Sequence, residues 1–265
     1  MNSNSNSLSS DVPAFSHQEY RMILSRLKEY LPILDYSEVT ENVNRFCVIR
    51  HDVEFSLERA LDLAQIEHDM DIQTSYFIQL GNNTYNAISK KSLDILRKIN
   101  KLGHKIGLHF TPTSSEEEVV NQEFIALKKI LDSRLDIDID RFSFHRPNLN
   151  PKLISSNIRI NGVINAYDKL YFEYFDDTIP ENPDIKYISD SNHQWKYGHP
   201  IDVVGGSCSK VQVLIHPFSW SKNGGDNLAN YLSLLKEKNN VLMDSINAEI
   251  SNFPKDDLKN IISLQ

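Results

Sequence analysis

FCVIRHDVE, residues 46–54, is the stretch that decides the fold of this chain. A short apolar run, Phe46 to Ile49, leads directly into the polar sequence Arg50-His51-Asp52-Val53-Glu54. An apolar run bounded in this way is typical of a buried strand. Ser56 follows and can cap a helix over residues 57–70, where apolar residues recur at helical spacing. The stretch therefore predicts a strand–turn–helix unit with ionisable residues at the carboxyl end of the strand.

The same unit repeats along the chain. Further strands are predicted at 75–80, 105–110, 142–144, 162–166, 185–188 and 211–215. Helices are predicted at 16–36, 92–102, 115–133 and 227–250, with capping boxes at Ser16/Glu19 and Ser115/Glu118. Strands that alternate with helices form βαβ units, so the predicted fold class is α/β with a parallel sheet. Seven or so strands can close into a barrel or stay open as a doubly wound sheet, and periodicity alone does not choose.

Length and charge narrow the class of protein. The 265 residues contain no internal repeat and no Gly- or Pro-rich linker, so we predict a single domain over 15–265. Residues 1–14 are polar and are expected to form a disordered tail. The tail lacks the basic and apolar regions of a signal peptide, so we expect a cytoplasmic protein. The formal net charge of −8 argues against a nucleic-acid partner, and no apolar run is long enough for membrane insertion.

Histidine and acidic residues gather where the predicted strands end. Four of the nine histidines lie at such points: His51, His109, His145 and His216. Because ligands of parallel α/β folds bind at the carboxyl ends of the strands, these side chains can share one pocket. A single histidine at a strand end is more often structural than functional, but four together favour a functional site. Asp52 and Glu54 lie on one side of an extended strand end, and His51 faces away from them.

Imidazole and carboxylate groups together suit Zn²⁺ and similar divalent ions. Such an ion lowers the pKa of a bound water molecule to about 7. A hydrolase built in this way also needs a base near the water, an acid for the leaving nitrogen and a positive group to hold the base or the oxyanion. Asp52, His216 and Arg146 are the candidates for these three roles.

Five motifs in order resemble the polysaccharide deacetylase superfamily. They are RHDVE (50–54), GHKIGLHF (103–110), FHRPN (144–148), DSNHQW (190–195) and LIHPFSW (214–220). The likeness covers about residues 45 to 220 and is strongest to the branch with a His-Asp-Val-Asp first motif, which is often associated with bacterial surface-polysaccharide synthesis. The resemblance implies a deformed (β/α) barrel of about seven parallel strands, one divalent metal ion, and hydrolysis of an N-acetyl group on a sugar or polysaccharide precursor.

The resemblance also implies roles for single residues. The two acidic residues of the first motif, one a base and one a metal ligand, match Asp52 and Glu54, or else His51 and Asp52 in a tighter register. His109 matches the first histidine of the metal motif. His216 matches the late histidine that acts as acid, Arg146 the arginine that orients the base, and Asp190 with Trp195 the late Asp-and-Trp motif. Trp195 and Trp220 are candidates for stacking on a sugar ring, with packing in the core an equal alternative.

Two positions depart from the family pattern. The second metal histidine of the family lies four residues after the first, where this chain has Thr113. His145 is our candidate to replace it, which gives a predicted ligand set of Asp52, Glu54, His109 and His145 around one ion, expected to be zinc. Glu54 stands where the most similar branch has Asp. Three interpretations remain open: a deacetylase with altered ligands, a hydrolase of another non-peptide C–N bond, or a non-catalytic carbohydrate-binding relic of the same fold.

Overall fold

The computed structural model describes residues 12–173, 183–203 and 208–263. By their contacts the residues divide into two compact units, Met1–Gly224 and Gly225–Gln265, and each is described by itself. Most of the expected disordered tail, residues 1–11, lies outside the described residues. The single domain over 15–265 stays a prediction. Within the described ranges, no helix has both the length and the apolar character needed to cross a membrane.

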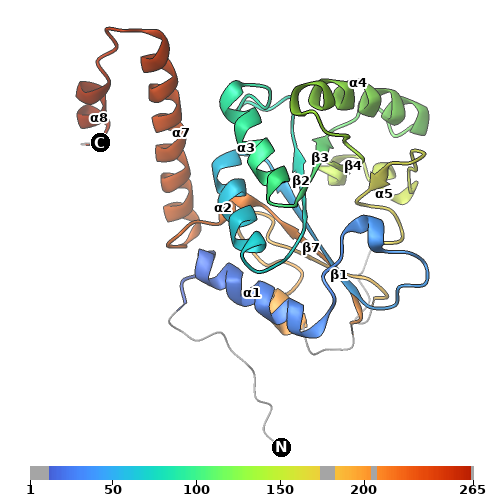
Figure 1. Ribbon diagram of the computed structural model, residues 1–265. Helices are drawn as coiled ribbons and strands as arrows, with labels where there is room; N and C mark the ends of the chain where they lie inside the picture. The colour runs from blue at the N-terminus through green and yellow to red at the C-terminus, as the bar shows by residue number, and fades with distance from the viewer. Residues whose placement is uncertain (1–11, 174–182, 204–207, 264–265) are drawn as a thin grey trace, which may run out of the picture. The chain divides into compact units, whose positions relative to one another are not determined.

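Seven parallel strands form the centre of the first unit (Figure 1). They lie in the order β5-β4-β3-β2-β1-β7-β6, and every pairing between neighbours is parallel. The strands are β1 (Phe46–Val53), β2 (Ser75–Ile78), β3 (Lys105–Phe110), β4 (Arg141–Phe144), β5 (Ile164–Asn165), β6 (Lys186–Ser189) and β7 (Lys210–Ile215). The predicted α/β class with seven parallel strands is confirmed. Since no pairing joins β5 to β6 among the described residues, the sheet is a deformed barrel that is open on that side.

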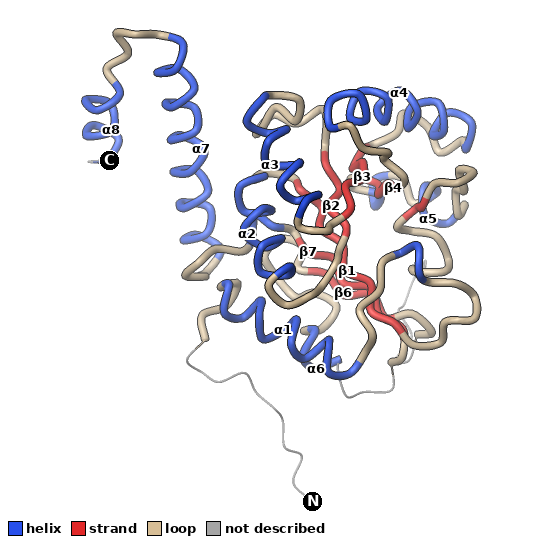
Figure 2. The backbone as a smooth tube through the Cα atoms, in the orientation of Figure 1, coloured by secondary structure: helices blue, strands red, loops and turns tan. Residues whose placement is uncertain are grey.

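Helices flank the sheet of the first unit, as the tube in Figure 2 shows. They are α1 (His17–Tyr30), α2 (Leu57–His68), α3 (Lys90–Lys101), α4 (Glu117–Leu135), α5 (Lys152–Ser155) and α6 (Pro200–Val203), with 3-10 turns η1 (Tyr36–Glu38), η2 (Pro147–Leu149) and η3 (Pro217–Ser219). The second unit holds α7 (Asn227–Glu249) and α8 (Lys255–Ser263).

The helix caps confirm two of the predicted starts and correct a third. The hydroxyls of Ser16 and Ser56 accept hydrogen bonds from the third residue of α1 and of α2, at 3.0 and 3.2 Å. The capping box predicted at Ser115 is wrong. The neighbouring Ser114 hydroxyl accepts from the Glu116 N–H at 3.1 Å, which leaves Glu116 in the cap position without a side-chain cap.

Residues of β1 alternate between two environments. Cys47 and Ile49 pack into a cluster with apolar residues of α1 and α2, on the helix side of the sheet. Phe46 and Val48 pack on the other side, against the apolar residues that fill the barrel. The same alternation carries Arg50 and Asp52 to the barrel side and His51 to the helix side. The barrel interior is therefore apolar near the amino end of β1 and polar near its carboxyl end.

A buried ion pair closes the amino end of the barrel. Arg141, which begins β4 and is fully buried, donates to both carboxylate oxygens of Asp35, at 2.5 and 3.2 Å, and to the Ser75 hydroxyl at 2.7 Å. Burial alone raises the pKa of Asp35, but hydrogen bonds from Arg141 and Ser37 outweigh it and lower that pKa to about 2. The carboxylate is thus ionised at neutral pH, and the charge of Arg141 is compensated.

Gly107 of β3 leaves room for two large side chains, those of Phe77 and Arg141, to pack against its backbone inside the barrel. A Cβ at this position would lie 2.6 Å from the Phe77 ring and 2.7 Å from the Arg141 side chain. Any other residue forces one of these buried side chains off its position, which is costly in a closely packed interior.

We expect Gly107→Ala to lower the free energy of unfolding by about 1–3 kcal/mol through this overpacking. Gly81→Ala is the matched control, since a Cβ there meets nothing within 4 Å. Urea unfolding of both variants measures the difference. Equal midpoints for Gly107→Ala and wild type would contradict the assigned close approach.

Candidate metal centre and acid–base site

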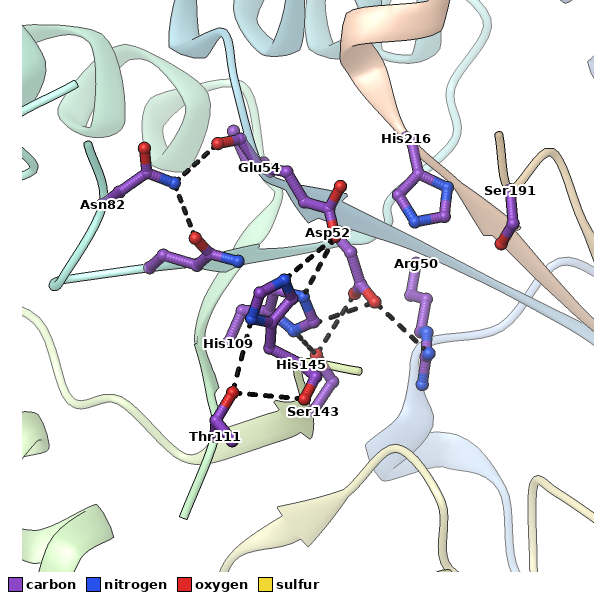
Figure 3. A network of polar contacts seen from close by, with 12 residues as sticks. Arg50, Asp52, Glu54, Asn82, His109, Thr111, Ser143, His145, Ser191 and His216 are labelled. Carbon is purple, nitrogen blue, oxygen red and sulfur yellow. Dashed lines mark hydrogen bonds and ion pairs between the residues drawn. The ribbon is translucent and has the colours of Figure 1, made fainter. Parts of the chain in front are cut away.

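The carboxyl ends of five strands bring the candidate residues together (Figure 3). Asp52 lies in β1 and Glu54 directly follows it, while His109 lies near the end of β3. Ser143 belongs to β4 and His145 follows it; Asp190 and His216 directly follow β6 and β7. Because all strands are parallel, these ends lie on one edge of the sheet, as the sequence predicted.

Glu54, His109 and His145 form a possible metal site. Their ligand atoms all lie within 4.8 Å of one another. Glu54 Oε1 is 3.9 Å from His109 Nε2 and 3.5 Å from His145 Nε2. One carboxylate and two imidazoles form a donor set that Zn²⁺ and related divalent ions accept. Three of the four predicted ligands thus converge, and Asp52 lies beside this cluster without being part of it.

Hydrogen bonds orient both imidazoles of the cluster. Ser143 has one hydroxyl proton, which it donates to Asp52 Oδ1 at 3.1 Å. The same hydroxyl must therefore accept from His109 Nδ1, 2.8 Å away, which leaves the lone pair of His109 on Nε2. Thr111 lies 3.3 Å from Nδ1 of His145, which again leaves Nε2 towards Glu54. Partners of this kind fix the tautomer and ring direction of metal-binding histidines.

Glu54 is held in its ionised form. Burial by itself raises the pKa of this carboxyl, but its interactions with the His109 and His145 rings and with the charge of His216 lower that pKa well below its usual range. A carboxylate that stays charged at all ordinary pH values is suited to bind a cation.

Asp52 is fixed by a cation that the sequence analysis did not select. Its Oδ2 accepts from Arg50 Nη2 at 3.3 Å, and both side chains are buried. The Arg50 guanidinium also lies over the Tyr167 ring, 4.3 Å from its centre, and donates to the Tyr167 hydroxyl at 2.7 Å. The signal was present in the sequence: Arg50 is a charged residue inside an apolar strand, two positions before Asp52 and therefore on the same face.

Arg146, the predicted partner of the base, has a different environment. Its side chain is exposed, and its backbone adopts a left-handed conformation at φ 50° where η2 begins. It makes no ion pair with any residue in the described ranges. The pairing expected for Arg146 belongs to Arg50 in this structure.

The Asp190 carboxylate fixes the orientation of the His216 ring. The Asp190 carboxylate accepts from the His216 backbone N–H at 2.9 Å and from ring atom Nδ1 at 2.6 Å. Burial lowers the pKa of His216, but the Asp190 charge and hydrogen bond, with smaller contributions from Glu54 and Asp52, raise it to about 9. His216 is therefore an imidazolium near neutral pH, with Nε2 left to donate a proton.

The two tryptophans, Trp195 and Trp220, differ in how far they are buried. Trp220 is fully buried and donates its indole N–H to Asp190 at 2.8 Å. It has no ring face free for a sugar, so the core alternative applies and its polar end supports Asp190. Trp195 is half-buried and stacks on Phe15 at 6.2 Å between ring centres. Its contact with a substrate stays a prediction.

Two further positions settle the register of the site. His51 points to the helix side, where Nε2 lies 2.9 Å from the Tyr20 hydroxyl and 3.1 Å from the Glu67 carboxylate. The pair on the barrel side is therefore Asp52 and Glu54. Thr113 is exposed and donates both its backbone N–H and its hydroxyl to Glu123, so it stands apart from the cluster.

No protein-family profile matches this chain, and no curated protein matches it significantly. Solved structures that it resembles include a family 4 acetyl xylan esterase from Clostridium thermocellum with a cobalt ion (11% identity, 72% of this chain, 84% of that chain, TM-score 0.40). Others are the chitin deacetylase of Colletotrichum lindemuthianum (15% identity, 72% and 81%, TM-score 0.41) and a CE4 family pseudoenzyme from Bacillus anthracis (10% identity, 76% and 62%, TM-score 0.41). These likenesses are too distant to assign an activity, so the chemistry has to be argued from the site.

We expect His145→Ala to weaken the binding of one Zn²⁺ ion at least tenfold, because it removes one of three converging donors. Thr113→Ala should bind as tightly as wild type, since Thr113 is outside the cluster. Calorimetric titration of protein first stripped with a chelator measures both affinities. The reverse ranking would show that position 113, and not position 145, supplies the ligand.

We expect Asp190→Asn to lower the pKa of His216 from about 9 towards 6.5. Because the folded-state pKa is raised, the stability that this pair contributes is fully present below about pH 6.5 and is lost as pH rises through 9. The variant should therefore be destabilised most at pH 6 and least near pH 10. NMR titration of the ring, with urea unfolding at both pH values after chelator treatment, tests this. A stability difference that is independent of pH would contradict it.

Proposed function

We propose that this protein is a metal-dependent hydrolase that removes an N-acyl group, an acetyl group by preference, from an amino sugar or polysaccharide precursor. The observation that carries the proposal is the placement of three groups on one edge of the sheet: the Glu54–His109–His145 cluster, the clamped Asp52 carboxylate, and the His216 imidazolium. A cation site, a base and an acid are the three components that amide hydrolysis requires.

Glu54, His109 and His145 would hold the metal ion. When bound, such an ion supplies Lewis-acid polarisation of the acyl oxygen and lowers the pKa of water. The donor chemistry favours zinc, and both imidazoles already have their Nδ1 atoms engaged by Ser143 and Thr111. This complete donor set counts against the non-catalytic interpretation that Thr113 suggested.

Asp52 acts as the general base. The Arg50 guanidinium and the Ser143 hydroxyl each take one of its oxygens, which fixes the plane of the carboxylate. The carboxylate accepts the proton of the water molecule that attacks the acyl carbon. Arg50 compensates the negative charge of this buried carboxylate.

His216 acts as the general acid. Asp190 holds its Nδ1 and keeps the ring protonated, so Nε2 donates its proton to the departing nitrogen and the amine leaves in neutral form. Asp190 is buried and bound on both oxygens, which makes it a positioning residue for His216.

The proposal that the substrate is a sugar is supported by the order of the five sequence motifs. It does not rest on a contact between the protein and a sugar. A soluble nucleotide-sugar or lipid-linked precursor fits the cytoplasmic location that we expect. An N-acyl bond outside a sugar uses the same three groups, so the substrate has to be found by assay.

We expect Asp52→Asn to reduce kcat about 10²–10⁴-fold, because it removes the base and keeps the shape. It should still bind one metal ion, since Asp52 is outside the cluster. Release of acetate from N-acetylated chito-oligosaccharides and from a panel of non-sugar amides provides the measurement. Full activity in Asp52→Asn, or activity that survives chelation, would contradict the mechanism. Turnover only of non-sugar amides would show that the substrate is not a sugar.

A further inference from the structure

Gln79 lies between two members of the metal cluster. Ile78, the last residue of β2, pairs with Val53 of β1 on one side and with Leu108 of β3 on the other. Continued by one residue, this register puts Gln79 level with Glu54 and with His109. Alternation along β2 puts its side chain on the face of Phe77, which is the barrel side. The side chain is 7% exposed.

The direction of the Gln79 amide follows from its neighbours. The backbone N–H of Thr84 is an obligatory donor, and it donates to Asn82 Oδ1 at 2.7 Å. Asn82 must then use Nδ2 for its other contacts, which are the backbone oxygen of Glu54 and Gln79 Oε1, both at 2.6 Å (Figure 3 shows Asn82 beside Glu54). Gln79 therefore presents its oxygen to Asn82, and its Nε2 is turned the other way.

Gln79 Nε2 is a buried donor without an acceptor. It has no hydrogen-bond partner in the described part of the chain and is shielded from solvent. An unsatisfied buried donor costs about 1–3 kcal/mol, so such a group calls for an explanation. Of the two neighbours at its level, His109 has Nδ1 engaged by Ser143 and Nε2 in the cluster. Only the Glu54 carboxylate has lone pairs to spare.

We propose that Gln79 is a positioning residue of the metal site, whose Nε2 donates to the Glu54 carboxylate oxygen that faces away from the ion when the cluster holds one. The inference rests on the proposed metal centre and adds a residue outside the five sequence motifs. Its function is to hold the plane of the Glu54 carboxylate, as second partners of metal-binding carboxylates do. The loop that carries Asn82 is itself tied to β1, because the Tyr85 hydroxyl donates to the Val53 carbonyl at 2.7 Å.

The first test replaces the donor and keeps the volume. We expect Gln79→Met to weaken Zn²⁺ binding about 10–100-fold in calorimetric titration of chelator-stripped protein. The visible absorption spectrum of the Co²⁺-loaded variant should also change, because the Glu54 ligand is no longer held. Urea unfolding of the metal-free variant, compared with wild type, checks that the fold is kept.

A second variant turns the amide without touching Gln79. In Asn82→Asp the new carboxylate cannot donate, so Gln79 reverses and presents Oε1 to Glu54, and the hydrogen bond to the Glu54 carbonyl is lost as well. An added negative charge by itself tightens cation binding, whereas the reversed amide weakens it. We expect weaker binding. Asn86→Asp adds the same charge to the same loop and keeps its acceptor contact with the Ile88 N–H, so it should bind at least as tightly as wild type.

The outcomes separate this inference from the metal site itself. Wild-type affinity in Gln79→Met, or tighter binding in Asn82→Asp, overturns the role of Gln79 and leaves the proposed function standing. Absence of stoichiometric metal in wild type, with no change on Glu54→Gln, overturns both.

Discussion

The buried ion pair between Arg50 and Asp52 is the interaction on which the barrel interior depends. Both charges lie on one strand, two residues apart, and neither side chain is more than 3% exposed. Removing a single partner from a buried pair of this kind costs about 3–5 kcal/mol, because the other charge is left uncompensated. The Ser143 hydroxyl and the Tyr167 ring and hydroxyl complete the surroundings of the pair. These groups supply polar partners for the two charges near the carboxyl end of β1.

This pair is a poor device for stability alone. The Nε and Nη1 atoms of Arg50 are buried without partners in the described part of the chain, so the guanidinium is only partly satisfied. Apolar residues of similar volume are often as stable as a buried ion pair or more so. A carboxylate held in a fixed orientation at the carboxyl edge of the sheet is what the proposed general base requires. The Arg50–Asp52 pair is therefore better explained by the proposed catalytic function of Asp52 than by a contribution to stability.

The register of β1 is fixed from both of its faces. On the helix side, His51 stacks on Tyr76 at 4.1 Å between ring centres and contacts the fully buried Glu67. Hydroxyls of Tyr20, Tyr76 and Thr74 also donate to Glu67, at 2.5, 2.6 and 2.9 Å. A slip of one residue would carry His51 into the barrel and would put the Asp52 carboxylate beside the Glu67 carboxylate, where like charges repel. The helix-side network contains the Glu67 carboxylate and the barrel-side network contains the Arg50 guanidinium. Together they hold Asp52 and Glu54 on the barrel side.

Sequence alone predicted the strands and the edge at which the ionisable residues meet, because those signals are local: apolar runs, caps, and polar residues at strand ends. It did not predict the pairing inside the barrel. In the sequence, Arg50 is only part of a motif and Ser143 is only a strand residue. The hydrogen bond from Ser143 of β4 to Asp52 of β1 joins residues far apart in the chain, so no spacing pattern indicates it. Arg146 and Trp220 were chosen by motif position, which carries no information on exposure. Exposure separates them: Arg146 is on the surface and Trp220 is in the core.

The position of His145 shows how a residue beyond one strand can join a cluster at the end of the neighbouring strand. His109 of β3 pairs with Ser143 of β4, so the chain positions just beyond both strands lie side by side at the same edge. The His145 N–H donates to the Phe110 carbonyl at 2.9 Å, which continues this pairing by one step and fixes the His145 backbone beside His109. The two rings then lie 5.1 Å apart. A histidine beyond β4 can therefore join Glu54 and His109 in the proposed metal site from the neighbouring strand.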